Sequence, residues 1–309
     1  MSWASDPDQS RTALFRSDLI AYGTYVRGHG LVSELPETMA HDHVCWIYRD
    51  DAELHAVGME FLAGGLARGE RLLCVGDQMA EGLRRDPGAL GGVAALTAAG
   101  TLEVLTLAEA YVAAGGFSTE RQWNFYDAAT RRALADGYTG LRVLADVTSL
   151  AGDPVHHDEL VRWEHVADEF IANGPGMSAL CGYRSDLPEA ALADVTSVHP
   201  LVHTAGDGAV PFRLFFDGRR LVLAGDVDTL DAERLTRALR SSPVEAGTPA
   251  LDLAELRFAD VAAYRAIAAW ARSLADDGEP VELWNAPALL RRTWQLLGLD
   301  EWASVSFPA

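Results

Sequence analysis

Short apolar runs alternate with amphipathic segments between residues 43 and 183, and this alternation restricts the fold more than any other feature. The runs that are typical of buried strands are 43–48, 71–76, 101–107, 141–150 and 177–183. Segments with helical spacing of apolar residues lie between most of them, at 51–69, 118–136 and 156–173. Strands that alternate with helices in this way predict crossover connections and a mainly parallel sheet. The fold class is therefore α/β.

The alternation stops at "HPLVHTAGDGAVP", which ends at residue 211, and a second block follows. This block begins with two short strands joined by Asp217-Gly218, a favoured hairpin turn. Further helices are expected at 228–242, 260–278 and 287–299, and strands at 248–256 and 280–285. The pattern predicts a lead-in segment at 1–37, a first domain at 38–205 and a smaller α/β domain at 210–309.

Charge and composition restrict the partners of the chain. The 45 acidic and 25 basic residues give a net charge of -20, which repels nucleic acids and anionic membrane surfaces. No apolar run reaches the ~18 residues of a membrane span, and the polar beginning lacks a signal core, so we expect a cytoplasmic protein. The three cysteines form no CxxC motif and fall in expected strands, which is typical of buried thiols. No cofactor is expected.

Residues 41–200 resemble the MEDS domain, a sensory domain of methanogens and methylotrophs. The runs that carry the resemblance are "HDHVCWIYRDDAEL", "FLAGGLARGERLLCVGD", "GTLEVLTLAEAYVAAGGFS", "GYTGLRVLADVTSL", "WEHVADEF" and "ALCGYRSD". The resemblance implies that this domain senses a small molecule. It also resembles, more distantly, the RecA-like ATPase core, but "YRDDAEL" stands where the phosphate-binding loop would be. That loop needs glycines and a lysine, so we expect a degenerate RecA-like domain without a P-loop.

The second block resembles the STAS domain of anti-anti-sigma factors. The resemblance rests on "LAGDVDTLDAERL", "LDLAELRFADVAAYRAIAAW" and "LWNAPALLRRTWQLLGLDE". Phosphorylatable members of that family carry Ser or Thr after an Asp at the start of a helix. Here Asp260 is followed by Val261, Ala262 and Ala263, so the phosphorylation switch is absent. The resemblance implies an anti-sigma factor or related kinase as partner. Asp260 is expected to cap its helix and to contact that partner.

Polar and aromatic residues near strand ends predict a small-molecule pocket in the first domain. Ligands bind near strand ends in open α/β sheets, where these side chains would form one rim. We expect Glu164 to point toward the sheet and to find a buried partner in His43 or Tyr48. The predicted ligand-binding residues are His43, Trp46, Tyr48, Asp77, Asp146, Glu164 and Tyr183.

The stretch "HDHVCWIY" allows a second interpretation. In a strand His41, His43 and Cys45 share one face, and neighbouring members of that face are ~6.6 Å apart. The two histidines could share a metal ion, but Cys45 is too far from His41 to join it. Packing of the strand between two helix layers explains the same pattern, so no metal site is assigned, and whether His41 and His43 bind a metal stays open.

The sequence therefore predicts a non-enzymatic regulator, in which the first domain senses a small molecule and the STAS-like domain binds a protein partner. No nucleophile motif or HExxH motif indicates catalysis, so no catalytic residue is assigned. Two alternatives remain. The chain could be a ligand-free scaffold or dimerisation protein, or it could be a small-molecule enzyme at the rim beside His43. A homodimer is a further partner state that the sequence leaves open.

Overall fold

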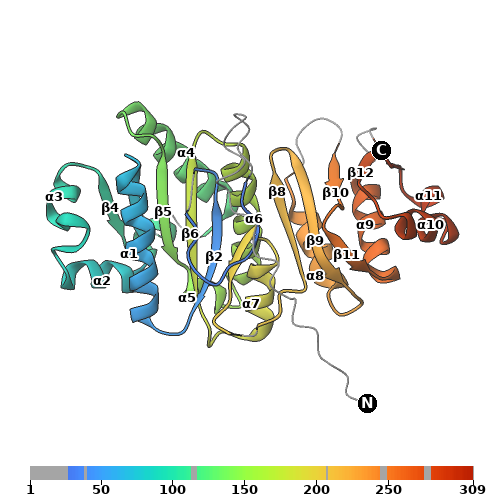
Figure 1. The fold of residues 1–309 in the computed structure, drawn as a ribbon, viewed down its shortest axis with the longest axis horizontal. Helices are drawn as coiled ribbons and strands as arrows, with labels where there is room; N and C mark the ends of the chain where they lie inside the picture. The colour runs from blue at the N-terminus through green and yellow to red at the C-terminus, as the bar shows by residue number, and fades with distance from the viewer. Residues whose placement is uncertain are drawn as a thin grey trace, which may run out of the picture.

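Two sheets lie side by side in the computed structural model, which describes residues 27–37, 40–112, 117–206, 208–243, 249–274 and 280–308 (Figure 1). The first sheet has seven strands, all parallel, in the order β1-β7-β2-β6-β5-β3-β4. The predicted α/β class, with a second and smaller sheet domain after the first, is confirmed. The strands of the first sheet are β1 (Gly30–Leu31), β2 (His43–Tyr48), β3 (Arg71–Val75), β4 (Leu102–Leu105), β5 (Leu141–Asp146), β6 (Met177–Arg184) and β7 (Leu201–His203).

Helices cover both faces of the first sheet, which explains why β2, β5 and most of β6 are buried along their length. Side chains of β2 alternate between the faces. Val44, Trp46 and Tyr48 pack on one side with α1, while Cys45 and Ile47 pack on the other with α4 and α6. The helices are α1 (Asp51–Ala67), α2 (Asp77–Arg85), α3 (Val93–Ala98), α4 (Thr119–Ala135), α5 (Thr148–Ala151), α6 (His157–Asn173) and α7 (Glu189–Thr196), with shorter turns at Ala89–Gly91 and Ala108–Val112.

The turn from β2 into α1 is where a RecA-like domain would carry its phosphate-binding loop. Asp50 is the N-cap of α1, and its carboxylate accepts the amides of Ala52 at 3.1 Å and Glu53 at 2.9 Å. Free amides at a helix N-terminus bind phosphate, but here a carboxylate of the chain itself already binds two of them. A nucleotide phosphate would meet negative charge at this point.

The second domain has a mixed sheet in the order β11-β9-β10-β12-β13, with β8 antiparallel to β9. The predicted hairpin at Gly218, whose φ is 57°, joins β8 (Phe212–Asp217) to β9 (Arg220–Val227). The remaining strands are β10 (Ala250–Asp252), β11 (Leu256–Ala259), β12 (Val281–Trp284) and β13 (Val305–Ser306). The helices are α8 (Ala232–Ser241), α9 (Val261–Leu274), α10 (Ala288–Leu296) and α11 (Leu299–Trp302).

The outer edge of β8 is covered by the first domain (Figure 1). The Leu214 amide donates to the Ser197 carbonyl at 2.7 Å, and the Phe216 amide donates to the Asp168 carboxylate at 2.7 Å. Val198 of the first domain belongs to the apolar core of the second. Edge strands expose unpaired backbone groups, and the first domain binds those of β8.

Some elements differ from the sequence prediction. The stretch placed at the domain boundary contains β7, which is only three residues long and too short for a periodic pattern. The expected strand at 248–256 is two strands, β10 and β11, separated by a turn, and both pair with β9. The expected strand at 141–150 ends at Asp146, and α5 takes up its last residues.

Candidate functional site

Four polar side chains from four parts of the first domain meet in its interior. His43 begins β2, Glu164 lies on α6, Cys181 lies on β6, and His199 lies between α7 and β7. All four are buried, and one ligand atom from each lies within 4.8 Å of the others. We call these four residues the buried centre.

The distances within the buried centre are short and similar. Glu164 Oε2 is 3.3 Å from His43 Nε2, 3.3 Å from Cys181 Sγ and 3.4 Å from His199 Nε2. Cys181 Sγ is 3.5 Å from His43 Nε2. The two imidazole rings pack with their centroids 4.1 Å apart. One carboxylate oxygen therefore lies between three nitrogen and sulfur atoms.

Regular structure brings these residues together. β2 and β6 are neighbours, and Cys45 is the register partner of Cys181, so both side chains point to the α6 side of the sheet. His43 is two residues before Cys45 and shares that face. On α6, Glu164 and Asp168 are one turn apart and point the same way. The four-residue spacing in "WEHVADEF" thus places two carboxylates beneath the start of β2.

Three of the four side chains, those of Glu164, His43 and His199, use their other polar atom to contact a neighbour. Tyr183 donates its hydroxyl to Glu164 Oε1 at 2.8 Å. His43 Nδ1 is 3.2 Å from Asp168 Oδ1, and His199 Nδ1 is 2.7 Å from the Val195 carbonyl oxygen. A carbonyl only accepts, so His199 Nδ1 carries the proton. These contacts hold both imidazole rings with Nε2 directed at Glu164.

Asp168 connects the buried centre to the second domain. Its Oδ1 binds His43 and the guanidinium of Arg27, and its Oδ2 accepts the Phe216 amide of β8 at 2.7 Å. Arg27 also donates to the Phe216 carbonyl at 2.6 Å. Asp168 and Arg27 are both buried, so this ion pair is shielded from solvent.

The electrostatics of the buried centre follow from burial and close contacts. Burial alone would raise the pKa of Glu164, but the neighbouring imidazoles of His199 and His43 hold that pKa well below its usual range. Burial would lower the pKa of His43, but hydrogen bonds with Asp168 and Glu164 outweigh it and raise that pKa. Burial and the neighbouring His43 lower the pKa of His199. Burial, followed by Glu164, raises the pKa of the Cys181 thiol well above its ordinary value.

Two other predicted site residues form a separate group at the opposite end of β2. The Tyr48 hydroxyl is 3.3 Å from Asp146 Oδ1 and 3.1 Å from Thr148 Oγ1. Burial, followed by the charge of Asp146, raises the pKa of Tyr48. Five steps of ~3.3 Å separate the ends of the strand, so His43 and Tyr48 lie at different rims of the sheet.

The structure divides the seven residues expected at one rim. His43, Glu164 and Tyr183 come together, and Tyr48 and Asp146 form the second group. Trp46 is buried on the α1 side, stacked on His203 with ring centroids 3.8 Å apart, and Asp77 is exposed at the first position of α2. Two features explain the division. His43 and Tyr183 face α6, whereas Trp46 and Tyr48 face α1. His43 also begins its strand, while Tyr48, Asp77 and Asp146 stand at carboxyl ends.

His41 does not share a site with His43. It precedes β2 with a φ of 75°, so the alternation of an H-x-H strand motif does not reach it. Its Nδ1 is 2.7 Å from the Ile171 carbonyl oxygen. Sequence reasoning instead missed His199 and Cys181 as neighbours of His43, because His199 lies in the stretch interpreted as a boundary and Cys181 in an apolar run.

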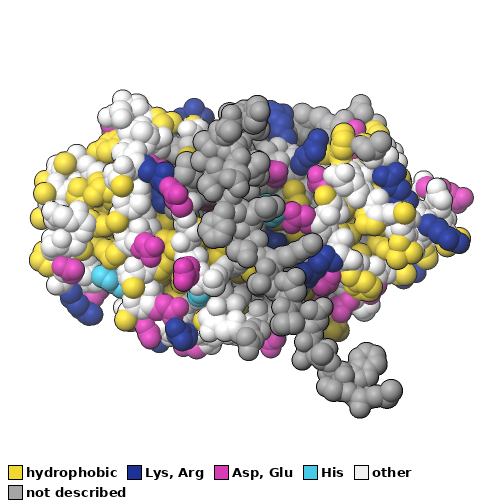
Figure 2. Space-filling model, in the orientation of Figure 1, with side chains coloured by type: hydrophobic (Ala, Val, Ile, Leu, Met, Phe, Trp, Pro, Cys, Tyr) yellow, Lys and Arg dark blue, Asp and Glu magenta, His cyan; other side chains and the backbone are white. Residues whose placement is uncertain are grey.

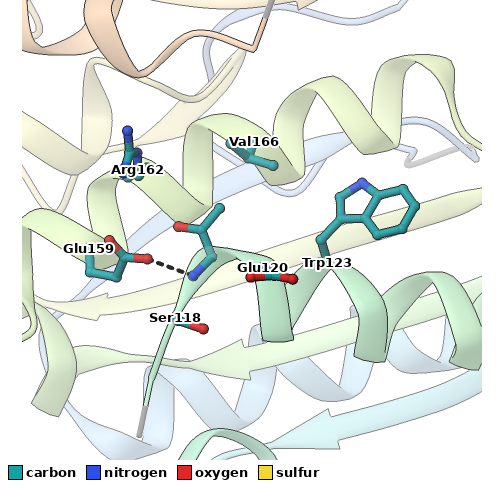
Figure 3. A pocket seen from close by; sticks show the side chains of 7 residues that line it. Ser118, Glu120, Trp123, Glu159, Arg162 and Val166 are labelled. Carbon is teal, nitrogen blue, oxygen red and sulfur yellow. Dashed lines mark hydrogen bonds between the residues drawn. The ribbon is translucent and has the colours of Figure 1, made fainter.

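An open pocket of about 470 Å³ lies on the far side of α6, away from the buried centre (Figure 3). The start of α4 forms one wall, where the Thr119 amide donates to Glu159 at 2.6 Å. Glu159, Arg162 and Val166 of α6 form the other, and Trp123 of α4 also lines it. None of the seven predicted ligand-binding residues lines this pocket.

Asp260 is the carboxylate at the start of α9 in the second domain. Its Oδ1 accepts the amides of Ala262 at 2.8 Å and Ala263 at 3.0 Å, as expected of a cap. Its Oδ2 accepts the Thr229 hydroxyl at 2.6 Å, which helps to lower the pKa of Asp260. No serine or threonine follows Asp260 in the first turn, so the hydroxyl beside it comes from a different segment.

Comparisons with known proteins agree with both domains. The family model described as "MEDS: MEthanogen/methylotroph, DcmR Sensory domain" matches residues 42–200, just over half of the chain. The model described as "Mlab, STAS domain" matches residues 213–306. A search of curated proteins found no match. Across the residues that the structure describes, no helix combines the length and apolar character needed to cross a membrane. The two predicted domain identities are confirmed, and the chain belongs to the MEDS family, with a STAS domain after its sensory domain.

Proposed function

We propose that the chain is a non-enzymatic signalling regulator. The MEDS domain senses a small ligand at the buried centre, and the STAS domain passes its state to a protein partner, an anti-sigma factor or a related kinase. The pairing of a sensory domain with a STAS domain fits a signalling regulator. The enclosure of His43, Glu164, Cys181 and His199 supports the binding of a small ligand, because buried polar groups need partners.

The observation that carries this proposal is the double role of Asp168. One oxygen binds His43 in the buried centre, and the other binds the backbone of β8 in the STAS domain. A ligand that moves His43 changes the position or charge environment of Asp168. Because Asp168 also binds Phe216, such a change favours one arrangement of β8 over another.

Further ion pairs and a hydrogen bond join the two domains near the Asp168–Phe216 contact. Asp194 of α7 binds Arg234 at 2.8 Å and Arg237 at 3.0 Å, both on α8. His165 of α6 is 2.8 Å from the Ser242 hydroxyl, at the end of α8. With these contacts on α8 and the Asp168 contact on β8, a shift of α6 reaches two elements of the STAS domain.

The start of α9 is the proposed partner-binding surface. Asp260 caps the helix, and Leu230, Phe258 and Val261, which are close to Thr229 or Asp260 in sequence, are exposed. Figure 2 shows hydrophobic side chains exposed among charged ones at the right of the view, where the STAS domain lies. Exposed apolar groups beside a charged cap suit a protein partner. Because no serine or threonine follows Asp260 in the first turn of α9, this binding does not depend on phosphorylation at that position.

Capture of partners from cells of the natural host tests the proposal. The full chain, the variant Phe258→Glu and the control variant Leu289→Glu are used as baits; Leu289 is an exposed apolar residue of α10. We expect an anti-sigma factor or kinase to bind the wild type and the control, and to be lost from Phe258→Glu. Identical recovery with all three baits, or recovery of no regulatory protein, would contradict the proposed output surface.

Coupling is tested with the captured partner. Asp168→Asn keeps the size of the side chain and removes its charge, and Asp158→Asn changes an exposed residue of the same helix. We expect Asp168→Asn to change the partner's affinity, and Asp158→Asn to leave it unchanged. Equal affinities for both variants would refute signalling through Asp168.

A further inference from the structure

We propose that His43, Glu164, Cys181 and His199 together bind one divalent transition-metal ion, and that zinc is the ion their chemistry suits best. The ligand atoms are those joined by the short distances: His43 Nε2, Glu164 Oε2, Cys181 Sγ and His199 Nε2. This inference names the ligand of the buried centre. The inference rests on the proposed function only where the metal ion is given a role in signalling, because metal binding itself is measured without a partner protein.

The spacing of the four atoms fits a tetrahedral ion. Zinc bonds to nitrogen, oxygen and sulfur are ~2.0–2.3 Å long, so the edges of a zinc tetrahedron are about 3.4 Å. Four of the six pairs in the buried centre are 3.3, 3.3, 3.4 and 3.5 Å apart. The other two pairs, both involving His199, are within 4.8 Å. Any adjustment around an ion would therefore fall on His199 alone.

The surroundings of the ligands match those of protein-bound metals. A histidine ligand usually donates its other ring proton to a carboxylate or a backbone carbonyl, which directs the free nitrogen at the ion. His43 Nδ1 faces Asp168, and His199 Nδ1 faces the Val195 carbonyl. Tyr183 binds Glu164 Oε1 and leaves Oε2 for the ion. Asp168 is itself held by Arg27.

The side chain of His199 gives an independent indication that a cation binds here. Its side chain is fully buried, and among the described residues its Nε2 has no hydrogen-bond partner. Because Nδ1 donates to Val195, a neutral His199 directs the lone pair of Nε2 at Glu164 Oε2, which is also a lone-pair acceptor. Protonating Nε2 instead would place a positive charge on a ring whose centroid is 4.1 Å from that of His43. A cation between these atoms satisfies both lone pairs.

Charge and ligand type decide which ion fits. The glutamate and a cysteine thiolate supply two negative charges, so a divalent ion gives a neutral centre in the interior, and the Asp168–Arg27 pair beside it is neutral as well. One thiolate with two imidazoles favours zinc over magnesium or calcium, which prefer oxygen ligands. Four protein ligands leave no open position, as in non-catalytic zinc sites.

Metal content and spectroscopy of the purified full chain test the inference. We expect one zinc ion per chain. X-ray absorption is expected to show one sulfur at about 2.3 Å and nitrogen or oxygen neighbours at about 2.0–2.1 Å. Protein refolded with Co²⁺ alone is expected to show a thiolate-to-cobalt charge-transfer band and intense visible bands of a tetrahedral site. A folded wild-type chain that binds neither Zn²⁺ nor Co²⁺ overturns the inference.

Paired variants locate the site. Cys181→Ser is expected to abolish the cobalt charge-transfer band, and Cys74→Ser, which changes a buried thiol on the other face of the sheet, is expected to keep it. Tyr183→Phe is expected to weaken zinc binding roughly 10- to 100-fold, and the control Tyr48→Phe to leave it unchanged. Equal metal binding in Cys181→Ser and wild type overturns the inference. If Cys181→Ser does not fold, the comparison of Tyr183→Phe with Tyr48→Phe decides whether the metal site exists. Equal zinc affinities for those two variants also overturn the inference.

The outcome is separable from that of the proposed function. Zinc bound at these residues in a chain that captures no partner supports the metal site and contradicts the proposed output. A captured partner together with a metal-free, folded chain does the reverse.

Discussion

The carboxylate of Asp168 accepts the backbone amide of Phe216 at 2.7 Å, across the boundary between the two domains. The same carboxylate binds His43 and Arg27 through its other oxygen. A single buried side chain thus belongs at once to the interior of the sensory domain and to the edge of the STAS sheet. The stability of this junction should depend on the charge of Asp168 more than on its shape.

Replacing Asp168 with asparagine is expected to lower the free energy of unfolding by about 3–5 kcal/mol. The change leaves the buried guanidinium of Arg27 without its anionic partner, and breaking a buried ion pair has that cost. Urea denaturation of the full chain measures the effect. The exposed neighbour variant Asp158→Asn should remain within about 0.5 kcal/mol of wild type. Similar losses in both variants would show that the charge of Asp168 is not what matters.

A second buried ion pair, between Arg142 of β5 and Glu70, permits a rescue experiment. Glu70→Ala should destabilise the chain by about 3–5 kcal/mol, because Arg142 is fully buried and keeps its charge. Adding Arg142→Met removes that charge and should recover much of the loss, since an apolar side chain can replace a buried ion. If the double variant unfolds at lower denaturant concentration than Glu70→Ala, the explanation is wrong.

Two adjacent glycines of α1 should respond in opposite directions to alanine. A methyl group on Gly65 would lie 2.4 Å from Arg142 Cδ and 3.0 Å from Glu70 Oε2, so Gly65→Ala should cost about 1–3 kcal/mol. A methyl group on Gly64 would meet Arg142 at 3.6 Å, which is an ordinary contact. Gly64→Ala should therefore stabilise the helix by about 0.5–1 kcal/mol. Thermal unfolding of the two variants, measured side by side, checks the sign of each.

The contact between His157 and Asp194 should make stability depend on pH. The hydrogen bond that His157 donates to Asp194 raises the pKa of His157, and the charge of Asp158 adds to the effect. A histidine with a raised pKa in the folded chain gives its full stabilisation below about pH 6.5, its unfolded pKa. That contribution is lost as the pH rises through the higher folded value. Unfolding free energies measured from pH 6 upward should fall more steeply for wild type than for His157→Gln, and parallel curves would contradict this assignment.

Apolar periodicity was sufficient to predict the parallel sheet, its helix layers and the second domain. The run 43–48 is β2 to the residue, because a strand covered on both faces has no polar interruption. β7 and β1 were not predictable, since they contain three and two residues and pair only through the tertiary fold. Asp260 as a helix cap followed directly from its position before an apolar helix.

The buried centre was only partly predictable. The spacing on α6 indicated that Glu164 faces the sheet, and His43 was one of two expected partners. The contribution of His199 depends on the path of the chain after α7, which no local pattern encodes. The approach of Arg27 to Asp168 joins residues 141 positions apart, and nothing in the separate segments indicates that they meet.

The covered edge of β8 has a consequence for modularity. A STAS domain cut from this chain would expose the backbone amides of Leu214 and Phe216 to solvent. Its apolar core would also lose the side chain of Val198, which the first domain supplies. An exposed strand edge can pair with a strand of another molecule, so the isolated STAS domain would tend to self-associate. Transplanting the sensory half onto a different output module would accordingly require that module to offer an equivalent strand.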